Sequence, residues 1–166
     1  ARVEVAVNEP PHCGYATVSP PSGHALVDAF ALGAPGWEDD AADLPLRYRF
    51  YFERGTRAGG WSWPPLQLRE AALSNAAAGV VLPVGYGANG TARVGAEVYD
   101  VWGASANSTA AVASTQKPLS AAALSAATGE LLAAAQEAYD GEKMLQVAAS
   151  AASMLAGTNC SLAPTC

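Results

Sequence analysis

The composition of this chain changes near residue 117, and this change constrains the fold more than any other feature. Twelve of the 13 aromatic residues lie in the first 102 positions, together with most of the prolines. Aromatic and Val-rich segments broken by Gly and Pro are typical of β-strands and turns. After Lys117-Pro118 the chain is rich in Ala, Leu and Glu, which favour helix. The sequence therefore predicts a β-domain over 1–117 followed by a helical part.

Hydrophobic residues recur with period two in the first part, which predicts short strands. In the clearest segment, 46–52, the side chains of Leu46, Tyr48, Phe50 and Phe52 share one face. Two prolines in 61–68 indicate an edge strand, because proline donates no hydrogen bond to a ladder. The expected strands cover 2–7, 15–19, 25–32, 46–52, 61–68, 78–84, 91–101 and 107–113. This turn spacing, without alternating helices, predicts an antiparallel β-sandwich rather than a parallel α/β sheet.

Three details of this β-domain are also predicted. Residues 20–23, Pro-Pro-Ser-Gly, are expected to form a turn. A second turn is expected over 100–103, with the Asp100 carboxylate bonded to backbone amides. The apolar face of 46–52 is expected in the centre of the core, opposite Val94, Ala96 and Val98.

The helical part is predicted to be a hairpin over 118–156. Its first helix runs from Leu119 to Tyr139, with a break at Gly129, and its second follows an Asp140 cap and ends at Gly157. The residues expected on the apolar faces are Leu124, Leu131, Leu132, Ala135 and Tyr139 in the first helix, and Met144, Val147, Ala148, Ala151 and Leu155 in the second. Residues 157–166 are predicted to be a cysteine-containing tail.

The charge and hydropathy of the chain disfavour two classes of protein. The 15 acidic residues outnumber the 9 basic ones, so the chain lacks the positive charge that nucleic acid binding requires. No apolar run reaches the roughly 18 residues of a membrane span. The chain begins at Ala1 without a signal peptide, so we expect it to be a processed segment of a longer protein.

The three cysteines predict one disulfide. Cys160 and Cys166 are spaced to close a small loop, and Cys13 is left over. Cys13 is then either buried and free, paired outside this segment, or a competitor for one of the C-terminal pair. Zinc is disfavoured, because there is no C-x-x-C and only two histidines.

Three Asn-x-Ser/Thr tripeptides are candidate glycosylation sites, at Asn89, Asn107 and Asn159. The first two fall in expected loops or strand edges, whereas Asn159 is hindered by its neighbour Cys160. Together with the cysteines, these sites predict an extracellular location.

Catalytic motifs are absent from the sequence. There is no G-x-S-x-G elbow, His12 and His24 flank a turn, and no glycine-rich phosphate loop joins a strand to a helix. We therefore expect no enzyme activity and no cofactor.

Two segments can contact a ligand, although each also has a simpler interpretation. An acidic loop can offer oxygens to Ca²⁺, but such a charge run is more often solvated; its residues are Glu38, Asp39, Asp40 and Asp43. Trp61, Trp63 and Tyr51 can form an aromatic platform for a sugar or a protein, or they can cover the sheet edge.

Several blocks of the sequence, taken in order, resemble the receptor-for-egg-jelly (REJ) module of polycystin-type membrane proteins. The blocks are Val18 to Phe30, Trp37-Glu38-Asp39, Leu44 to Phe50, Leu82-Pro83-Val84-Gly85 and Val98 to Ala104. The resemblance covers about residues 12–115, and the tail with Tyr139-Asp140-Gly141 resembles the helices that follow this module, before a juxtamembrane autoproteolysis domain.

The resemblance implies a fold and a setting. It implies fibronectin-type-III-like or immunoglobulin-like β-sandwiches in the ectodomain of a large ciliary or gamete-surface protein, serving adhesion or sensing without catalysis. It also implies a cysteine near Gly33 that would pair with Cys13, and this sequence has none there.

We therefore expect a non-catalytic extracellular module that serves structural spacing, adhesion or ligand sensing. Its expected partners are other extracellular domains of the same protein and protein or glycan ligands. One alternative is a carbohydrate-binding module that uses exposed Trp61 and Trp63. Another is a secreted structural protein that self-assembles through its Ala-rich helices.

Overall fold

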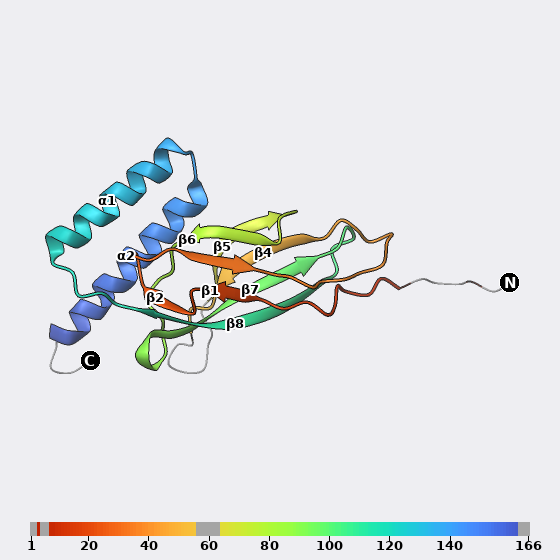
Figure 1. The fold of residues 1–166 in the computed structure, drawn as a ribbon, viewed down its shortest axis with the longest axis horizontal. Helices are drawn as coiled ribbons and strands as arrows, with labels where there is room; N and C mark the ends of the chain where they lie inside the picture. The colour runs from red at the N-terminus through yellow and green to blue at the C-terminus, as the bar shows by residue number, and fades with distance from the viewer. Residues whose placement is uncertain (1–2, 4–6, 56–63, 163–166) are drawn as a thin grey trace.

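The computed structural model describes Val3, residues 7–55 and residues 64–162, the last six of these by their backbone alone. The described chain is mainly β, with two sheets and a C-terminal pair of helices, as predicted (Figure 1). The five-stranded sheet has the order β2 (Ser22–His24), β8 (Ser105–Thr115), β7 (Thr91–Tyr99), β4 (Arg47–Phe52) and β5 (Leu66–Ala72). The three-stranded sheet has the order β1 (Thr17–Ser19), β3 (Phe30–Gly33) and β6 (Ala76–Val80).

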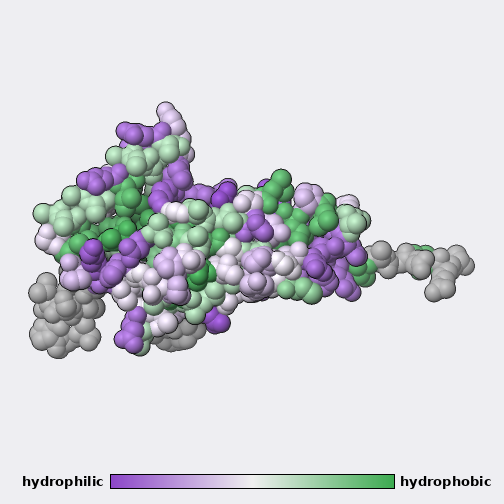
Figure 2. Space-filling model, viewed as in Figure 1, coloured by the Kyte–Doolittle hydropathy of each residue, from purple (hydrophilic) through white to green (hydrophobic). Residues whose placement is uncertain are grey.

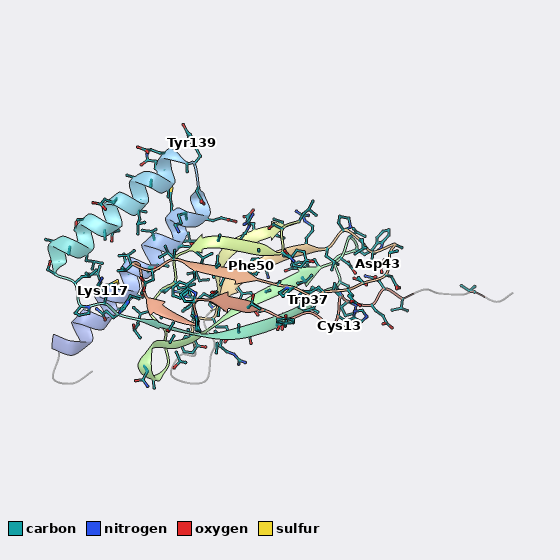
Figure 3. All side chains as sticks on the ribbon, viewed as in Figure 1. Cys13, Trp37, Asp43, Phe50, Lys117 and Tyr139 are labelled. Atoms are coloured by element: carbon teal, nitrogen blue, oxygen red, sulfur yellow. The ribbon has the colours of Figure 1, made fainter. Side chains whose placement is uncertain are left out.

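The two sheets enclose a common hydrophobic core. Phe30 and Leu32 of β3 pack in one cluster with Phe50 and Phe52 of β4 and with Val94 of β7, and Figure 3 shows Phe50 among the strands in the middle of the molecule. The alternation predicted for β4 is confirmed, since both Phe side chains are buried. One detail differs from the prediction. The partners of β4 on β7 are cross-strand neighbours in the same sheet, and the strands that face β4 across the core are β3 and β6.

The segment from 20 to 32 folds differently from its prediction. Residues 22 and 23, expected in a turn, belong with His24 to β2, which pairs in parallel with the end of β8. Of the strand expected over 25–32, only the end forms, as β3, because residues 25–28 form a turn. In that turn the amide of Asp28 donates to His24 O at 3.0 Å, and Leu26 takes a φ of 66°. The turn directs the Leu26 side chain into a second core cluster near the helices.

Three other strand predictions have different outcomes. The strand expected over 2–7 falls mostly outside the described residues, and the described Val3 and Val7 have exposed side chains. Of the strand expected over 61–68, residues 61–63 lie outside the described residues, and β5 begins only at Leu66, after both prolines; β5 is the last strand of the five-stranded sheet, so the edge position is as predicted. The strand expected over 78–84 ends at Val80, where β6 ends.

The turn after β7 has the predicted structure. Asp100 Oδ1 accepts hydrogen bonds from the amides of Trp102, Gly103 and Ala104, at 2.8, 2.6 and 3.0 Å. Its other oxygen accepts from Asn8 Nδ2 at 2.6 Å, and this hydrogen bond joins the N-terminal segment to the turn. Burial by itself raises the pKa of Asp100, but these hydrogen bonds outweigh it and hold the pKa below its usual value.

The first helix, α1 (Ala121–Glu137), begins at a Ser120 cap whose hydroxyl accepts from the amide of Ala123 at 3.2 Å. The predicted break at Gly129 is wrong, because α1 is continuous there. The Thr128 hydroxyl donates to Leu124 O within α1 at 2.8 Å. Tyr139, predicted on the apolar face, projects from the tip of the helix pair with 95% of its surface exposed (Figure 3).

The second helix, α2 (Gly141–Leu162), buries a different face from the one predicted. The Asp140 cap is confirmed, since its Oδ1 accepts from the amide of Lys143 at 2.8 Å. Met144 and Leu155 of the predicted stripe are 39% and 54% exposed. Val147 of that stripe is buried, as predicted, but the residues buried with it are Gln146, Ser150 and Met154, which were not predicted. The helix also continues past Gly157 to Leu162.

Hydrogen bonds from polar side chains explain this orientation of α2. Gln146, 4% exposed, accepts from the amide of Val81 at 3.0 Å and donates to Leu68 O of β5 at 2.7 Å. Ser153 Oγ accepts from the amide of Val84 at 3.0 Å. These groups lie on an edge strand and on the segment after β6, where no neighbouring strand supplies partners. The helix therefore satisfies backbone groups that the sheets leave open.

The second core cluster joins the helices to the sheets. Leu26 and Val81 pack there with Val147 and Met154, and Leu131 of α1 covers them. Figure 2 shows hydrophobic residues gathered where α1 faces α2, whereas hydrophobic and hydrophilic residues are mixed over the sheets. No helix in the described part of the chain is both long enough and apolar enough to cross a membrane.

Candidate functional site

A groove of about 650 Å³ lies over the outer face of the five-stranded sheet. We call it the outer groove. Its lining residues come from β4, β5, β7, β8 and two loops; they are Arg49, Tyr51, Glu53, Arg54, Gly55, Pro65, Gln67, Tyr86, Glu97 and Asn107. The period-two alternation that buries Phe50 and Phe52 places Arg49 and Tyr51 in this groove.

Tyr51 forms part of the floor of the groove, because a glycine lies beside it. A Cβ atom on Gly95 would lie 2.1 Å from Tyr51 Cζ, so only glycine leaves room for the ring over β7. Gly95 pairs with Tyr51 of β4 on one side and with Thr109 of β8 on the other. The ring therefore crosses toward β8. Burial, followed by the Glu53 and Glu97 charges, raises the pKa of Tyr51, so the phenol is protonated at neutral pH.

A charged pair lies next to Tyr51. The Arg49 guanidinium forms an ion pair with Glu97, and its Cζ lies 5.6 Å from the centre of the Tyr99 ring. Both charged side chains are partly exposed, so the pair contributes little stability and is available to a ligand. Burial, together with the neighbouring Glu97 carboxylate, raises the pKa of Tyr99 to about 12.

The far rim of the outer groove is aromatic and acidic. The Tyr86 hydroxyl donates to Glu53 Oε2 at 3.3 Å, and its ring packs against Gly55, whose φ is 72°. Burial is the main cause that raises the pKa of Tyr86. The groove thus combines aromatic rings with positively charged hydrogen-bond donors and negatively charged acceptors, which suits the recognition of a polar ligand.

The residues predicted to contact ligands are only partly described. Tyr51 lies in the outer groove, whereas Trp61 and Trp63 lie outside the described residues. Asn107 is exposed in the wall of the groove, on β8. Asn89 is exposed in the short 3-10 helix η1 (Ala88–Gly90), with a φ of 57°. Asn159 belongs to α2, and its side chain lies outside the described residues.

The family of the chain is shown by comparison with protein-family models. A model described as the REJ domain matches residues 1–149. The chain belongs to the REJ family. The resemblance found in the sequence is therefore confirmed, and the match extends past the sheets over α1 and the first part of α2. Searches of curated proteins and of solved structures found no match.

The acidic loop of this REJ domain is not gathered into a metal site. Asp43 Oδ1 accepts from Trp102 Nε1 at 3.0 Å, and Asp39 Oδ1 accepts from the amide of Asp40 at 2.9 Å. The backbone of Glu38 pairs with that of His12. Among the described residues, no three His, Cys, Asp or Glu side chains lie close enough together to hold a metal ion. The Ca²⁺ hypothesis therefore gains no support.

The predicted Cys160–Cys166 disulfide stays a prediction, but the alternative that Cys13 is buried and free is wrong, because its side chain is exposed. Cys13 is exposed at the end of the REJ domain far from the helices, near Trp37 and Asp43 (Figure 3). It forms no disulfide within the described part of the chain. Cys166 lies outside the described residues, and Cys160 is described only by its backbone in α2.

The sequence interpretation missed the polar face of α2. Gln146, Ser150 and Ser153 are spaced by four and three residues, which places them on one side of a helix. The interpretation followed alanine and leucine instead. A row of amide and hydroxyl side chains at helical spacing in an Ala-rich helix was the available signal.

Proposed function

We propose that this REJ domain is a non-catalytic extracellular module of a polycystin-like membrane protein, with a fibronectin-type-III-like sandwich as its β-domain. Membership of the REJ family supports the setting. Two sheets that enclose one core, with mostly antiparallel pairing, support the type of fold. The module acts as a spacer between other parts of the ectodomain.

The observation that carries the spacer proposal is the attachment of α2 to the β-domain. Gln146 and Ser153 bind backbone groups of β5 and of the segment after β6. The Glu142 carboxylate accepts from the amide of Glu70 at 2.5 Å, and Lys143 donates to Gly79 O. The described chain begins at one end of the elongated molecule, and α2 runs out at the other end (Figure 1). A unit fastened along its length in this way transmits orientation from one neighbour to the next.

The extracellular location is tested on native cells. Antibodies raised against residues 7–55 are expected to label intact, non-permeabilised cells. Labelling that requires permeabilisation would contradict the location. Trypsin treatment of intact cells is the matching control, because it should remove the signal if the epitope lies outside.

A second candidate function is ligand contact through the outer groove. The ring of Tyr51 on the groove floor and the exposed polar groups around it favour a sugar or a polar peptide segment. In this case Tyr51→Ala is expected to abolish binding on a glycan or peptide array. Tyr139→Ala, at a 95% exposed position far from the groove, should leave it unchanged.

The C-terminal disulfide is also part of the proposal. In an oxidising extracellular setting, Cys160 and Cys166 are expected to pair with each other. Peptide mapping without reduction of secreted protein tests this. A bridge from Cys13 to either of the other two cysteines would overturn it.

A further inference from the structure

The outer groove contains a glycosylation acceptor in its own wall. Asn107 and Thr109, the two defining residues of the tripeptide, both belong to β8 and lie two positions apart, so they share a face of the sheet. Asn107 is exposed and lines the groove. It pairs with Glu97, the partner of Arg49, and Thr109 pairs with Gly95.

The aromatic floor of the groove lies beside this acceptor. The Tyr51 ring covers Gly95, whose other neighbour in the sheet is Thr109. An aromatic ring offers an apolar face on which the C–H groups of a sugar can pack. The guanidinium of Arg49 and the carboxylate of Glu97 lie next to it and can bond sugar hydroxyls. The groove volume of about 650 Å³ is in the range of small-molecule sites.

We propose that Asn107 carries an N-linked glycan whose first sugar lies in the outer groove and packs on Tyr51. The inference rests on the proposed extracellular function. It also deepens the second candidate function, because the sugar that the groove holds belongs to the chain itself.

The covalent step requires a lipid diphosphate-linked oligosaccharide, the sugar donor of the secretory pathway. Asn107 Nδ2 attacks C1 of the first sugar, and the Nδ2–C1 bond forms while the bond from C1 to the diphosphate oxygen breaks. Nδ2 loses one proton, and the lipid diphosphate leaves.

Asn89 provides a matched control within the same chain. It is also exposed and also begins an Asn-x-Thr tripeptide, but it lies in η1 and does not line the outer groove. A glycan on Asn89 is therefore expected to extend into solvent without affecting the fold.

The experiment compares the two sites in the chain secreted from eukaryotic cells. Glycopeptide mass spectrometry gives the occupancy of Asn89 and Asn107. Thermal melts are then measured for Asn107→Gln and for Asn89→Asp, each with Tyr51 intact and with Tyr51→Ala. Asp removes the acceptor at position 89 and tolerates its φ of 57°. After trimming to a single sugar, the Asn107 glycan is expected to raise Tm by about 2–4 °C. That increase should vanish with Tyr51→Ala, and Asn89→Asp should leave Tm unchanged in both backgrounds.

The possible outcomes separate the two proposals. If Asn89 is occupied and Asn107 is bare, this inference fails and the extracellular location stands. If neither site is occupied in protein isolated from its native cells, the location loses its support as well. If Asn107 is occupied but its effect on Tm is the same without Tyr51, the packing is refuted. Should Tyr51→Ala fail to fold, Tyr51→Leu keeps the bulk of the side chain and removes its aromatic face.

Discussion

At the scale of single residues, the carboxyl group of Asp100 and the phenol of Tyr99 make the stability of the fold depend on pH. Asp100 accepts four hydrogen bonds, three from its own turn and one from Asn8. Tyr99 lies at the end of β7 beside Arg49. The pKa of the first group is lowered and that of the second is raised, so they affect stability at opposite ends of the pH scale.

Asp100→Ala is expected to lower Tm at pH 7 by about 4 °C or more, because three amides lose their acceptor. The native pKa of Asp100 is below that of the unfolded chain, so its contribution is present above about pH 4. That contribution is lost as pH falls through the native pKa. The gap between variant and parent in thermal melts should therefore narrow as the pH falls below about 4. Asp40→Ala, at an exposed position, serves as the control; an equal loss there would contradict the account.

The raised pKa of Tyr99 predicts how the stability of the domain changes at alkaline pH. Its native pKa of about 12 exceeds the unfolded value of 10, so its contribution to stability is full below pH 10 and is lost as pH rises toward 12. Tyr99→Phe is expected to make the fall in Tm over this interval shallower. Tyr139→Phe, at an exposed position, should leave the curve unchanged. Identical pH curves for Tyr99→Phe and the parent protein would refute the assignment.

At the scale of elements, Gln146 joins α2 to the β-domain. Gln146→Leu keeps the volume of the side chain but leaves the Val81 amide and the Leu68 carbonyl without their partner. Unsatisfied buried groups cost about 1–3 kcal/mol each, so the two groups together predict a loss of about 2–6 kcal/mol in the free energy of unfolding. Gln136→Leu on the exposed face of α1 is the control, with a change below about 0.5 kcal/mol. Denaturant melts measure the free energy of unfolding of both variants. Equal losses for the two would show that the hydrogen bonds of Gln146 are unimportant for stability.

The main core and the helical cluster should differ in their sensitivity to truncation. Phe50 is 1% exposed between the sheets, and Phe50→Ala is expected to cost about 3–5 kcal/mol. Leu124 is only half buried against the second cluster, so Leu124→Ala should cost about 1–2 kcal/mol. If thermal melts rank Leu124→Ala as the more damaging change, the helices and not the sheets organise the fold.

The elements that could be predicted from sequence are those whose own side chains determine their burial. In β4 and β7 the alternation of Phe50, Phe52 and Val94 with polar residues is sufficient, and the Asp100 turn follows from local chemistry. The existence of β2 and the orientation of α2 were not predicted. Strand β2 exists because the distant β8 supplies its partner, and α2 is rotated because its polar residues meet open backbone groups of the sheets. Both depend on a partner far away in the chain.

The candidate site was predictable only in part, for the same reason. The aromatic character of Tyr51 and the Asn107 tripeptide are visible in the sequence. Their proximity is not, because it depends on the register of three strands and on the absence of a side chain at Gly95. A site assembled across strands is found only once the sheet is known.

At the scale of the whole molecule, the central claim is that sheets and helices form one rigid REJ module. The domain boundary predicted at residue 117 stays a prediction. The hydrogen bonds from α2 to β5 and to Val81 indicate that the β-domain and the helices unfold together. The second core cluster, which mixes residues of both parts, supports the same view.

Native-state hydrogen exchange tests this claim most directly. The amides of α2 around Val147 and those of β7 around Ala96 are expected to exchange through a single global opening, with the same free energy and the same denaturant dependence. If the α2 amides open at a free energy lower by about 2 kcal/mol or more while β7 stays protected, the helices are an independent appendage and the module is not one rigid spacer.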